Sequence, residues 1–514
     1  MEDGMVEVGP EPLAFAQVEA VARDGAKVVL TDRALRLIGE ARAHIEELSS
    51  RPLPVYGVST GFGALATRHI APELRARLQL NIVRSHAAGS GPEVEREVVR
   101  ALMLLRLRTL ATGRTGVQPV TARTLASLLN AGITPVVHEH GSLGCSGDLA
   151  PLAHVALALI GEGEVRDAAG GLRPAASALA EAGIEPVTLG AKEGLALLNG
   201  TDGMLGMLVL AIRDLSRLLT AADLAAAMSV EALLGTDRVF AEDLHALRPH
   251  PGQGLSAANL RALLADSEIM ESHRGPDCTR VQDAYSLRCS PQVNGAARDT
   301  LAHAELVASR ELASAVDNPV VLPDGRVESN GNFHGAPLAY VLDFLAIPVA
   351  DVASMSERRT DRMLDRARSG GLPAFLADDP GVDSGHMIAQ YTQAALVSEL
   401  KRLAVPASTD SIPSSAMQED HVSMGWNAAR KLRRAVDGLA QVVGIEILTA
   451  ARALDLRRPL RPGPATAAVV AALRERVPGP GPDRHLAPEI AAATGLVRDG
   501  TLVAAAESVT GRLA

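Results

Sequence analysis

Residues 141–154 read GSLGCSGDLAPLAH, a glycine-rich turn that leads into the start of an apolar helix. Asp148 belongs to the residue types that cap helix N-termini, and Pro151 is tolerated in a first helical turn. The positive pole of the predicted helix would adjoin the turn and favour negative charge that develops there. From its local pattern alone, the segment is compatible with an ordinary capped turn or an anion-binding loop.

On both sides of this turn the chain favours long helices. No proline occurs between Pro186 and Pro249, between Gln292 and Asn318, or between Ser414 and Arg458. Apolar residues recur at helical spacing in the first and last of these stretches; they are Leu205, Leu208, Ile212, Leu215 and Leu219, then Val422, Trp426, Leu432, Val436, Leu439, Val443 and Ile447. The pattern predicts long helices packed side by side as a bundle.

The region before about residue 112 has a mixed character. Residues 27–30, KVVL, predict a short strand, and Thr31 or Asp32 can cap a helix that runs to about Leu48. The Pro- and Gly-rich residues 51–65 predict a loop. We therefore predict a mainly α protein, with a small mixed N-terminal domain (1–112) and an elongated long-helix bundle (113–514) whose shorter C-terminal helices follow residue 459.

The amino-acid composition indicates a folded protein and argues against several classes of partner. The 514 residues are 47% apolar and carry a net charge of -10, which argues against a disordered chain and against nucleic acid or an anionic membrane as a partner. The three cysteines, Cys145, Cys278 and Cys289, cannot form a disulfide framework and suit a reducing compartment. The acidic N-terminus does not resemble a signal peptide, and the apolar runs are shorter than the roughly 20 residues of a membrane span. These features predict a cytoplasmic location.

The segment 141–154 resembles the signature of the aromatic amino acid ammonia-lyases, whose fold is an elongated, fumarase/aspartase-like helical bundle. In that family an Ala-Ser-Gly or Cys-Ser-Gly tripeptide cyclises to 4-methylidene-imidazol-5-one (MIO). The resemblance implies that the Gly147 amide nitrogen attacks the Cys145 carbonyl, and that Ser146 loses water to leave an exocyclic methylene. Glycine lets the two backbone groups approach each other. No diffusible cofactor is implied.

Three further segments resemble motifs of the same family. Residues 56–63, YGVSTGFG, are similar to the loop whose tyrosine, here Tyr56, takes the β-proton of the substrate. Ser85-His86 is similar to the pair found in histidine-specific members, where it sorts substrates by side chain. Residues 192–205 resemble the segment whose asparagine, here Asn199, reaches the substrate and the ring; Asn199 is also a candidate turn or capping residue for the helix predicted to start near Thr201.

Residues 281–293, VQDAYSLRCSPQV, place Gln282, Tyr285 and Arg288 three positions apart, on one face if the stretch is helical. Guanidinium grips a carboxylate with two hydrogen bonds, and an amino acid substrate supplies that carboxylate. By resemblance Arg288 is this clamp, Tyr285 belongs with the catalytic residues, and Gln282 lines the pocket beside it. Without the resemblance, the pattern would indicate a solvated polar helix face.

Two later segments complete the resemblance. Residues 331–337, GNFHGAP, place Phe333 where the family packs an aromatic side chain against the ring. Residues 415–424, SAMQEDHVSM, place Glu419 where histidine-specific members engage the imidazole. Met417 stands where the family often has asparagine, and Asp420 is predicted to cap the following helix.

Together the motifs imply a histidine-specific member that converts L-histidine to trans-urocanate and ammonia, the first step of histidine degradation. The family forms homotetramers with active sites shared between subunits. The alternatives are a tyrosine or phenylalanine ammonia-lyase, an aminomutase, or a helical scaffold that lacks the ring. His138 and His140 have a spacing that metal sites use, but without a plausible third and fourth ligand we expect them to be structural and predict no metal.

Overall fold

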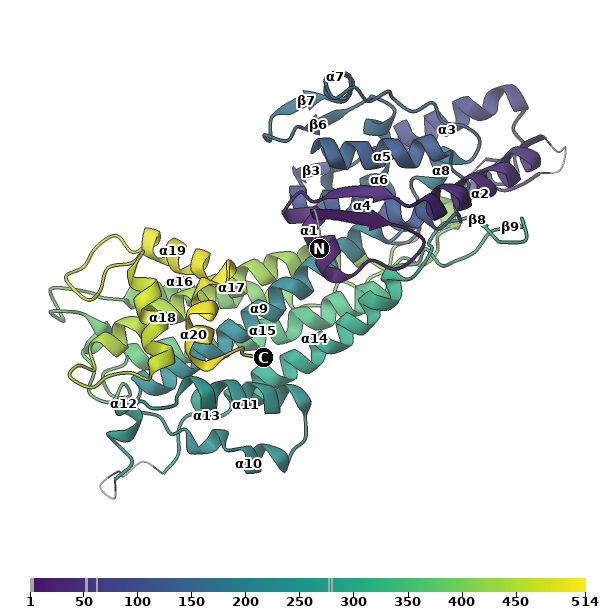
Figure 1. The fold of residues 1–514 in the computed structure, drawn as a ribbon. Coiled ribbons are helices and arrows are strands. Elements are labelled where there is room, and N and C mark those ends of the chain that lie inside the picture. The colour runs from purple at the N-terminus through teal and green to yellow at the C-terminus, as the bar shows by residue number, and fades with distance from the viewer. Residues whose placement is uncertain (1–3, 51–53, 62, 276–277, 279–280) are drawn as a thin grey trace. The chain divides into compact units, whose positions relative to one another are not determined.

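The computed structural model describes residues 4–50, 54–61, 63–275, 278 and 281–514. Its helices and short strands confirm the mainly α prediction (Figure 1). By their contacts the residues form two compact units: 1–210 with 305–343 and 406–430, and 211–304 with 344–405 and 431–514. The predicted division into a mixed N-terminal domain (1–112) and a helical bundle (113–514) stays a prediction.

The first unit surrounds helix α4 (Arg96–Ala111), which is buried along almost its whole length. Helices α1, α2 and α5 pack on α4, and α3 packs on α6 and α8. The strand predicted at residues 27–30 is confirmed as β2, paired in parallel with β1, and Thr31 Oγ1 caps the next helix by accepting from the Ala34 amide at 3.1 Å. The elements are β1 (Met5–Val8), α1 (Phe15–Arg23), β2 (Lys27–Leu30), α2 (Asp32–Ser50), η2 (Gly63–Leu65), α3 (Pro72–His86), β3 (Ser90–Glu93), α4, α5 (Pro119–Ala131), β4 (Thr134–Pro135), β5 (His138–His140), α6 (Leu149–Leu159), β6 (Glu164–Arg166), β7 (Leu172–Pro174), α7 (Ala175–Glu181), α8 (Glu193–Ala196), β8 (Val320–Val321), β9 (Val327–Glu328) and η5 (Ser415–Met417).

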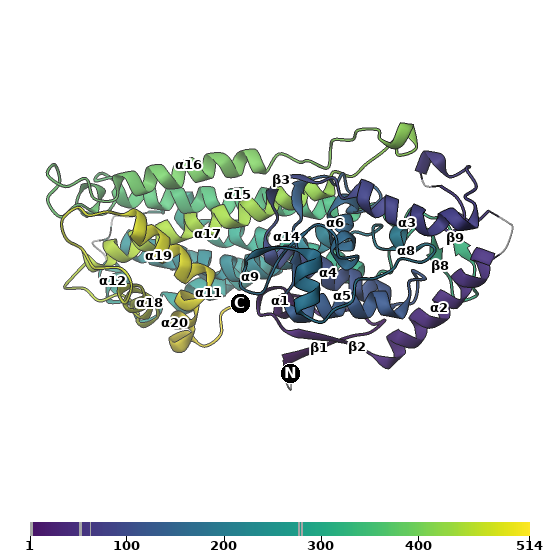
Figure 2. The ribbon, with the colours of Figure 1, turned by 90° about the horizontal axis from the view of Figure 1, so that it is seen from above.

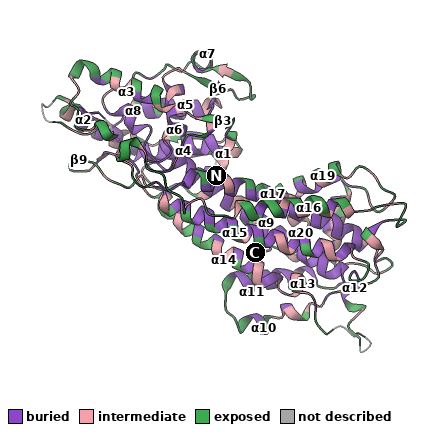
Figure 3. Cartoon of the chain, turned by 180° about the vertical axis from the view of Figure 1, so that it is seen from behind, coloured by how far each residue is buried: buried purple, intermediate pink, exposed green. Residues whose placement is uncertain are grey.

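Long helices begin or end in the first unit and continue in the second; they are α9 (Asp202–Ala232), α14 (Ser290–Leu312), α15 (Ala336–Leu364) and α17 (Gly425–Asp455). Helices α9, α14 and α17 lie in the three proline-free stretches, with α14 beginning two residues earlier at Ser290. Helix α15 lies in a further segment. The predicted apolar positions in α9, in α17 and at Val422 just before α17 are buried. Figure 3 colours the chain by burial. Helix α15 is long and apolar enough to cross a membrane by length and composition, but 61% of its apolar window is buried inside the protein, as in a core helix.

In the second unit α16 lies beside α15 and α17 (Figure 2), and the Gln393 amide on α16 donates to the Val442 carbonyl at 2.8 Å. Helices α11, α18 and α20 pack together, and α19 packs on α20. The elements of this unit are η3 (Arg238–Phe240), α10 (Glu242–Ala246), α11 (Pro251–Leu263), α12 (Glu268–Glu271), α13 (Tyr285–Arg288), η4 (Ala374–Leu376), α16 (Met387–Leu403), α18 (Pro464–Arg474), α19 (Ala487–Arg498) and α20 (Thr501–Thr510).

One capping prediction holds for the position but not for the contact, and a second is wrong. Asp148 occupies the N-cap position of α6, as predicted, but its side chain makes no capping hydrogen bond there. Its Oδ2 accepts from the Gly203 and Met204 amides, each at 2.9 Å, and so caps α9. Asp420 lies too far before α17 to cap it. Ser423 caps α17 instead, because its Oγ accepts from the Gly425 amide at 3.2 Å.

Gln282, Tyr285 and Arg288 would share one helical face only if the whole stretch were helical, and the structure does not meet this condition. Helix α13 begins only at Tyr285, so Gln282 lies in the preceding coil. Tyr285 and Arg288 remain together, with the guanidinium carbon 4.8 Å from the centre of the phenol ring.

Candidate active site

The turn that contains the tripeptide leaves room for backbone only. Gly147 has φ +82°, and a β-carbon built on it would lie 2.1 Å from the carbonyl oxygen of Gly200. The neighbouring Asp148 amide donates to that oxygen at 2.7 Å. Glycine is therefore required at position 147 by both the backbone conformation and the close approach.

Several helix starts converge on this turn. The Gly335 amide, directly before α15, donates to the Gly144 carbonyl at 3.0 Å, and the Ser423 hydroxyl, before α17, donates to the same oxygen at 2.8 Å. Asp148 directly precedes α6 and caps α9. The positive poles of these helices all lie at the turn, so negative charge that develops there is stabilised.

Glu419 lies directly against the tripeptide. Its Oε1 accepts from the Ser146 hydroxyl at 3.0 Å, and its Oε2 accepts from the Cys145 thiol at 3.3 Å and from the Ser414 hydroxyl at 2.6 Å. Burial and the charge of Glu419 raise the pKa of the Cys145 thiol to about 12. The thiol is thus protonated at neutral pH and acts as a donor rather than a nucleophile.

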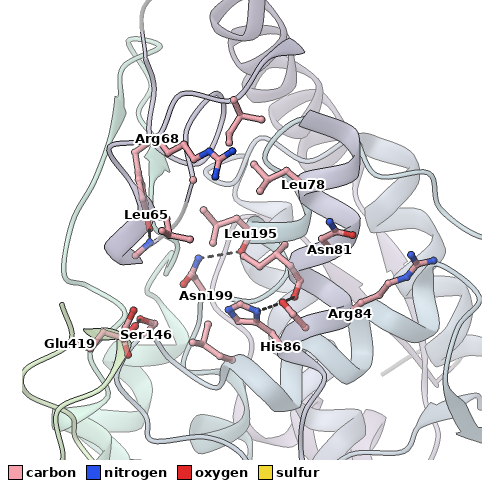
Figure 4. A pocket seen from close by; sticks show the side chains of 18 residues that line it. Leu65, Arg68, Leu78, Asn81, Arg84, His86, Ser146, Leu195, Asn199 and Glu419 are labelled. Atoms are coloured by element: carbon pink, nitrogen blue, oxygen red, sulfur yellow. Dashed lines mark hydrogen bonds between the residues drawn. The ribbon is translucent and has the colours of Figure 1, made fainter. Parts of the chain in front are cut away.

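A cavity of about 840 Å³ opens beside Ser146 (Figure 4). This volume is ample for an amino acid. The cavity brings together five of the site residues predicted from the sequence, and they come from segments far apart in the chain: Tyr56, His86, Ser146, Asn199 and Glu419.

His86 ends helix α3, and its Nδ1 lies 3.1 Å from the Ser85 hydroxyl. Burial lowers the pKa of His86 below its usual value, and a backbone contact with Ile82 and the charge of Glu419 oppose that shift. The imidazole is therefore neutral at pH 7 and has one donor and one acceptor nitrogen. It can hydrogen-bond a neutral heteroaromatic substrate.

Tyr56 and Asn199 present polar groups to the same cavity. The Tyr56 phenolic oxygen accepts from the Gly63 amide at 3.3 Å. The Asn199 side-chain amide donates to the carbonyls of Leu195 and Asn318 at 3.2 and 3.1 Å, which leaves its oxygen to accept a hydrogen bond from a ligand such as an ammonium group.

Buried ion pairs hold the segment that carries Asn199. The Lys192 ammonium contacts Asp317 Oδ2 at 2.5 Å, and both side chains are fully buried. Arg106 pairs with Asp202 and donates to the Ala196 carbonyl at 3.2 Å. Charges this deeply buried are retained only when they are paired, so these four side chains tie residues 192–202 in place.

In the part of the chain that the structure describes, the remaining predicted residues do not line this cavity. Gln282, Tyr285 and Arg288 belong to the second unit. Phe333 lies half-buried in the turn before α15, next to His334, whose Nε2 is 3.2 Å from His421 Nδ1. His138 Nδ1 lies 3.0 Å from the Gly91 carbonyl, and the described part of the chain contains no cluster of three candidate metal ligands that includes it.

Ser414, Ser423 and the buried ion pairs were not predicted from the sequence. Serine is common in loops, and the charged residues of each ion pair are distant in sequence. Only Ser423, two residues before the start of α17 at Gly425, could have been predicted from the sequence, as a helix-capping residue.

The residues present fit the ring that the tripeptide would form. Position 147 accepts only glycine, Ser146 lines the cavity, and residues at the starts of α15 and α17 donate to the Gly144 carbonyl in the same turn. Comparison with known proteins decides the family, because the profile of aromatic amino acid lyases matches residues 13–475. The chain belongs to the aromatic amino acid lyase family.

Individual lyases and their structural relatives match over nearly the full length. The histidine ammonia-lyase of Streptomyces avermitilis is 68% identical, with 99% of each chain covered. The crystal structure of histidine ammonia-lyase from Trypanosoma cruzi superposes with a TM-score of 0.90 at 39% identity, covering 98% of this chain and 95% of that one. The tyrosine aminomutase of Streptomyces globisporus has a TM-score of 0.93 at 38% identity, covering 99% and 100%.

Proposed function

We propose that this lyase eliminates ammonia from L-histidine to give trans-urocanate, the first step of histidine degradation. The observation that carries the proposal is the Glu419 carboxylate, which lies 3.0 Å from the Ser146 hydroxyl in a cavity that His86 also lines. A carboxylate is a good acceptor for an imidazole N–H and a poor neighbour for a phenyl ring. The 68% identity to a histidine ammonia-lyase supports the same substrate.

The prosthetic group would be MIO, formed from Cys145, Ser146 and Gly147 with loss of two water molecules. When formed, it supplies an electrophilic carbon that makes the substrate amine a better leaving group. No diffusible cofactor and no metal are proposed.

The other residues would bind the substrate and move its proton. Glu419 and His86 hold the imidazole, and the Asn199 oxygen accepts from the amine. Tyr56 takes the β-proton at its phenolic oxygen as the carbon–nitrogen bond breaks.

A neighbouring subunit would complete the site. We propose a homotetramer in which Gln282, Tyr285 and Arg288 of one subunit, with Arg288 as the carboxylate clamp, serve the cavity of another; Phe333 would pack against the ring. Exposed apolar side chains in the second unit support assembly, among them Phe344, Ile347 and Tyr391, which are 46%, 48% and 60% exposed. Mixing inactive Tyr56→Phe and Arg288→Ala subunits should restore part of the activity if sites are shared, and none if each chain is self-sufficient.

We further propose a cytoplasmic enzyme that needs no nucleic acid or membrane. The net charge of -10 and the burial of α15 support this location.

The second candidate is an aminomutase, because a tyrosine aminomutase superposes with a TM-score of 0.93. Incubation with L-histidine, L-tyrosine and L-phenylalanine, with detection of each acrylate product and of β-amino acids, separates the candidates. We expect urocanate from histidine and no β-amino acid. A β-tyrosine product, or cinnamate or coumarate formed faster than urocanate, would contradict the proposal.

A further inference from the structure

The two oxygens of the Glu419 carboxylate are held by different groups. Oε1 accepts from the Ser146 hydroxyl at 3.0 Å. Oε2 accepts from the Ser414 hydroxyl at 2.6 Å and from the Cys145 thiol at 3.3 Å. Ser414 and Glu419 also pair through their backbones, with the Ser414 amide donating to the Glu419 carbonyl at 2.8 Å. The side chain is therefore held from two sides.

Ring formation changes only one of these contacts. It is part of the proposed function, on which this inference rests. The Gly147 nitrogen bonds to the Cys145 carbonyl carbon, that carbonyl oxygen leaves as one water, and the Ser146 hydroxyl leaves as the other. Oε1 thereby loses its donor. The Cys145 side chain takes no part in these bonds, so the donors to Oε2 remain.

The Cys145 thiol is suited to a lasting contact. It is only 6% exposed, and burial together with the charge of Glu419 raises its pKa to about 12. It therefore keeps its proton at neutral pH. A thiol is a weak donor, but the acceptor here is a carboxylate in a partly buried place, where a hydrogen bond to a charged group is strengthened.

We propose that Cys145 and Ser414 are positioning residues that anchor Oε2 of Glu419. Oε1 loses its hydrogen-bond donor when Ser146 loses its hydroxyl, and it then points toward the substrate imidazole. Maturation of the tripeptide thus opens the acceptor that the substrate N–H then uses. Cys145 contributes its carbonyl to the ring and its side chain to substrate binding.

The test compares Cys145→Ala, Cys145→Ser and Ser414→Ala with the wild-type protein. Cys145→Ala creates the Ala-Ser-Gly tripeptide that the family also uses, so the ring should form and its near-UV absorbance should be unchanged. Ser411→Ala is the matched control, because the Ser411 hydroxyl lies in the same segment and accepts from the Val422 amide at 3.0 Å. The readouts are that absorbance, kcat and KM for L-histidine, and the Kd of trans-urocanate measured without turnover.

We expect Cys145→Ala and Ser414→Ala each to raise KM and the urocanate Kd by about three- to tenfold, the range for loss of one hydrogen bond, with a smaller change in kcat. Cys145→Ser should recover much of the loss, since its hydroxyl also donates. Unchanged KM and Kd in both alanine variants, or an equal rise in Ser411→Ala, would overturn the inference.

A double-mutant cycle locates the effect at Glu419. In a Glu419→Gln background, Cys145→Ala should change the urocanate Kd by less than about twofold, because the carboxylate it anchors is gone. A full and additive effect in that background would contradict a role through Glu419. Failure of the wild-type protein to convert histidine would instead contradict the proposed function, and the positioning role with it.

Discussion

Gly147 lies so close to Gly200 that a β-carbon on Gly147 would stand 2.1 Å from the Gly200 carbonyl oxygen. Gly147→Ala should displace the turn and prevent cyclisation, with loss of the near-UV absorbance and of turnover. Gly25→Ala is the matched control, because Gly25 also has a positive φ of +70° but open space around it. We expect the control to lower stability slightly and to leave activity intact. Normal absorbance and turnover in Gly147→Ala would show that the close contact is not needed.

Tyr56→Phe removes only the phenolic oxygen that we propose as the base. The ring should form, because Tyr56 is not part of the tripeptide, and the near-UV absorbance should persist. Elimination should fall by at least about a hundredfold, the lower end for loss of a general base. Turnover of histidine at the wild-type rate would assign the base to another residue.

Arg288→Lys keeps the positive charge and removes the fork that grips a carboxylate with two bonds. A charge-assisted hydrogen bond contributes about 1.5–3 kcal/mol, so kcat/KM for histidine should fall by roughly tenfold or more. Steady-state kinetics at fixed ionic strength measures the effect. Kinetics like those of the wild-type protein would remove Arg288 from the carboxylate role.

His386 couples stability to pH. The side chain is 2% exposed, its Nδ1 lies 3.1 Å from the Thr449 hydroxyl, and burial followed by the charges of Arg452 and Arg484 lowers its pKa from 6.5 to about 3. Between these values the unfolded chain binds a proton that the folded protein does not, so His386 costs stability progressively as pH falls from about 6.5 towards 3. The Tm of His386→Gln should therefore depend less steeply on pH in this window. Parallel Tm curves for variant and wild type would contradict the assignment.

The long helices could be predicted because apolar spacing and the absence of proline are local properties of the sequence. The side chain that caps each helix start could not be predicted in the same way. Asp148 precedes one helix and caps another, and Ser423 takes the position predicted for Asp420. Aspartate and serine are both good caps, and the choice depends on which amides lie nearby in three dimensions.

The contacts within the candidate site could not be predicted from local sequence patterns either. Local pattern alone allowed the tripeptide turn to be an ordinary capped turn, and family resemblance indicated Tyr56, His86, Asn199 and Glu419. Their gathering around Ser146 depends on tertiary packing. The three-residue spacing of Gln282, Tyr285 and Arg288 suggested one helical face, but the helix starts only at Tyr285. Spacing predicts a shared face only where the helix extends over all the residues concerned.

The intact mass of the purified protein tests the central claim most directly. Cyclisation and dehydration at Cys145-Ser146-Gly147 should leave the wild-type chain lighter than its sequence mass by two water molecules, while Ser146→Ala should not show the dehydration and should be inactive. A wild-type protein that converts histidine to urocanate at its full sequence mass, or a Ser146→Ala variant that does so, would contradict the account.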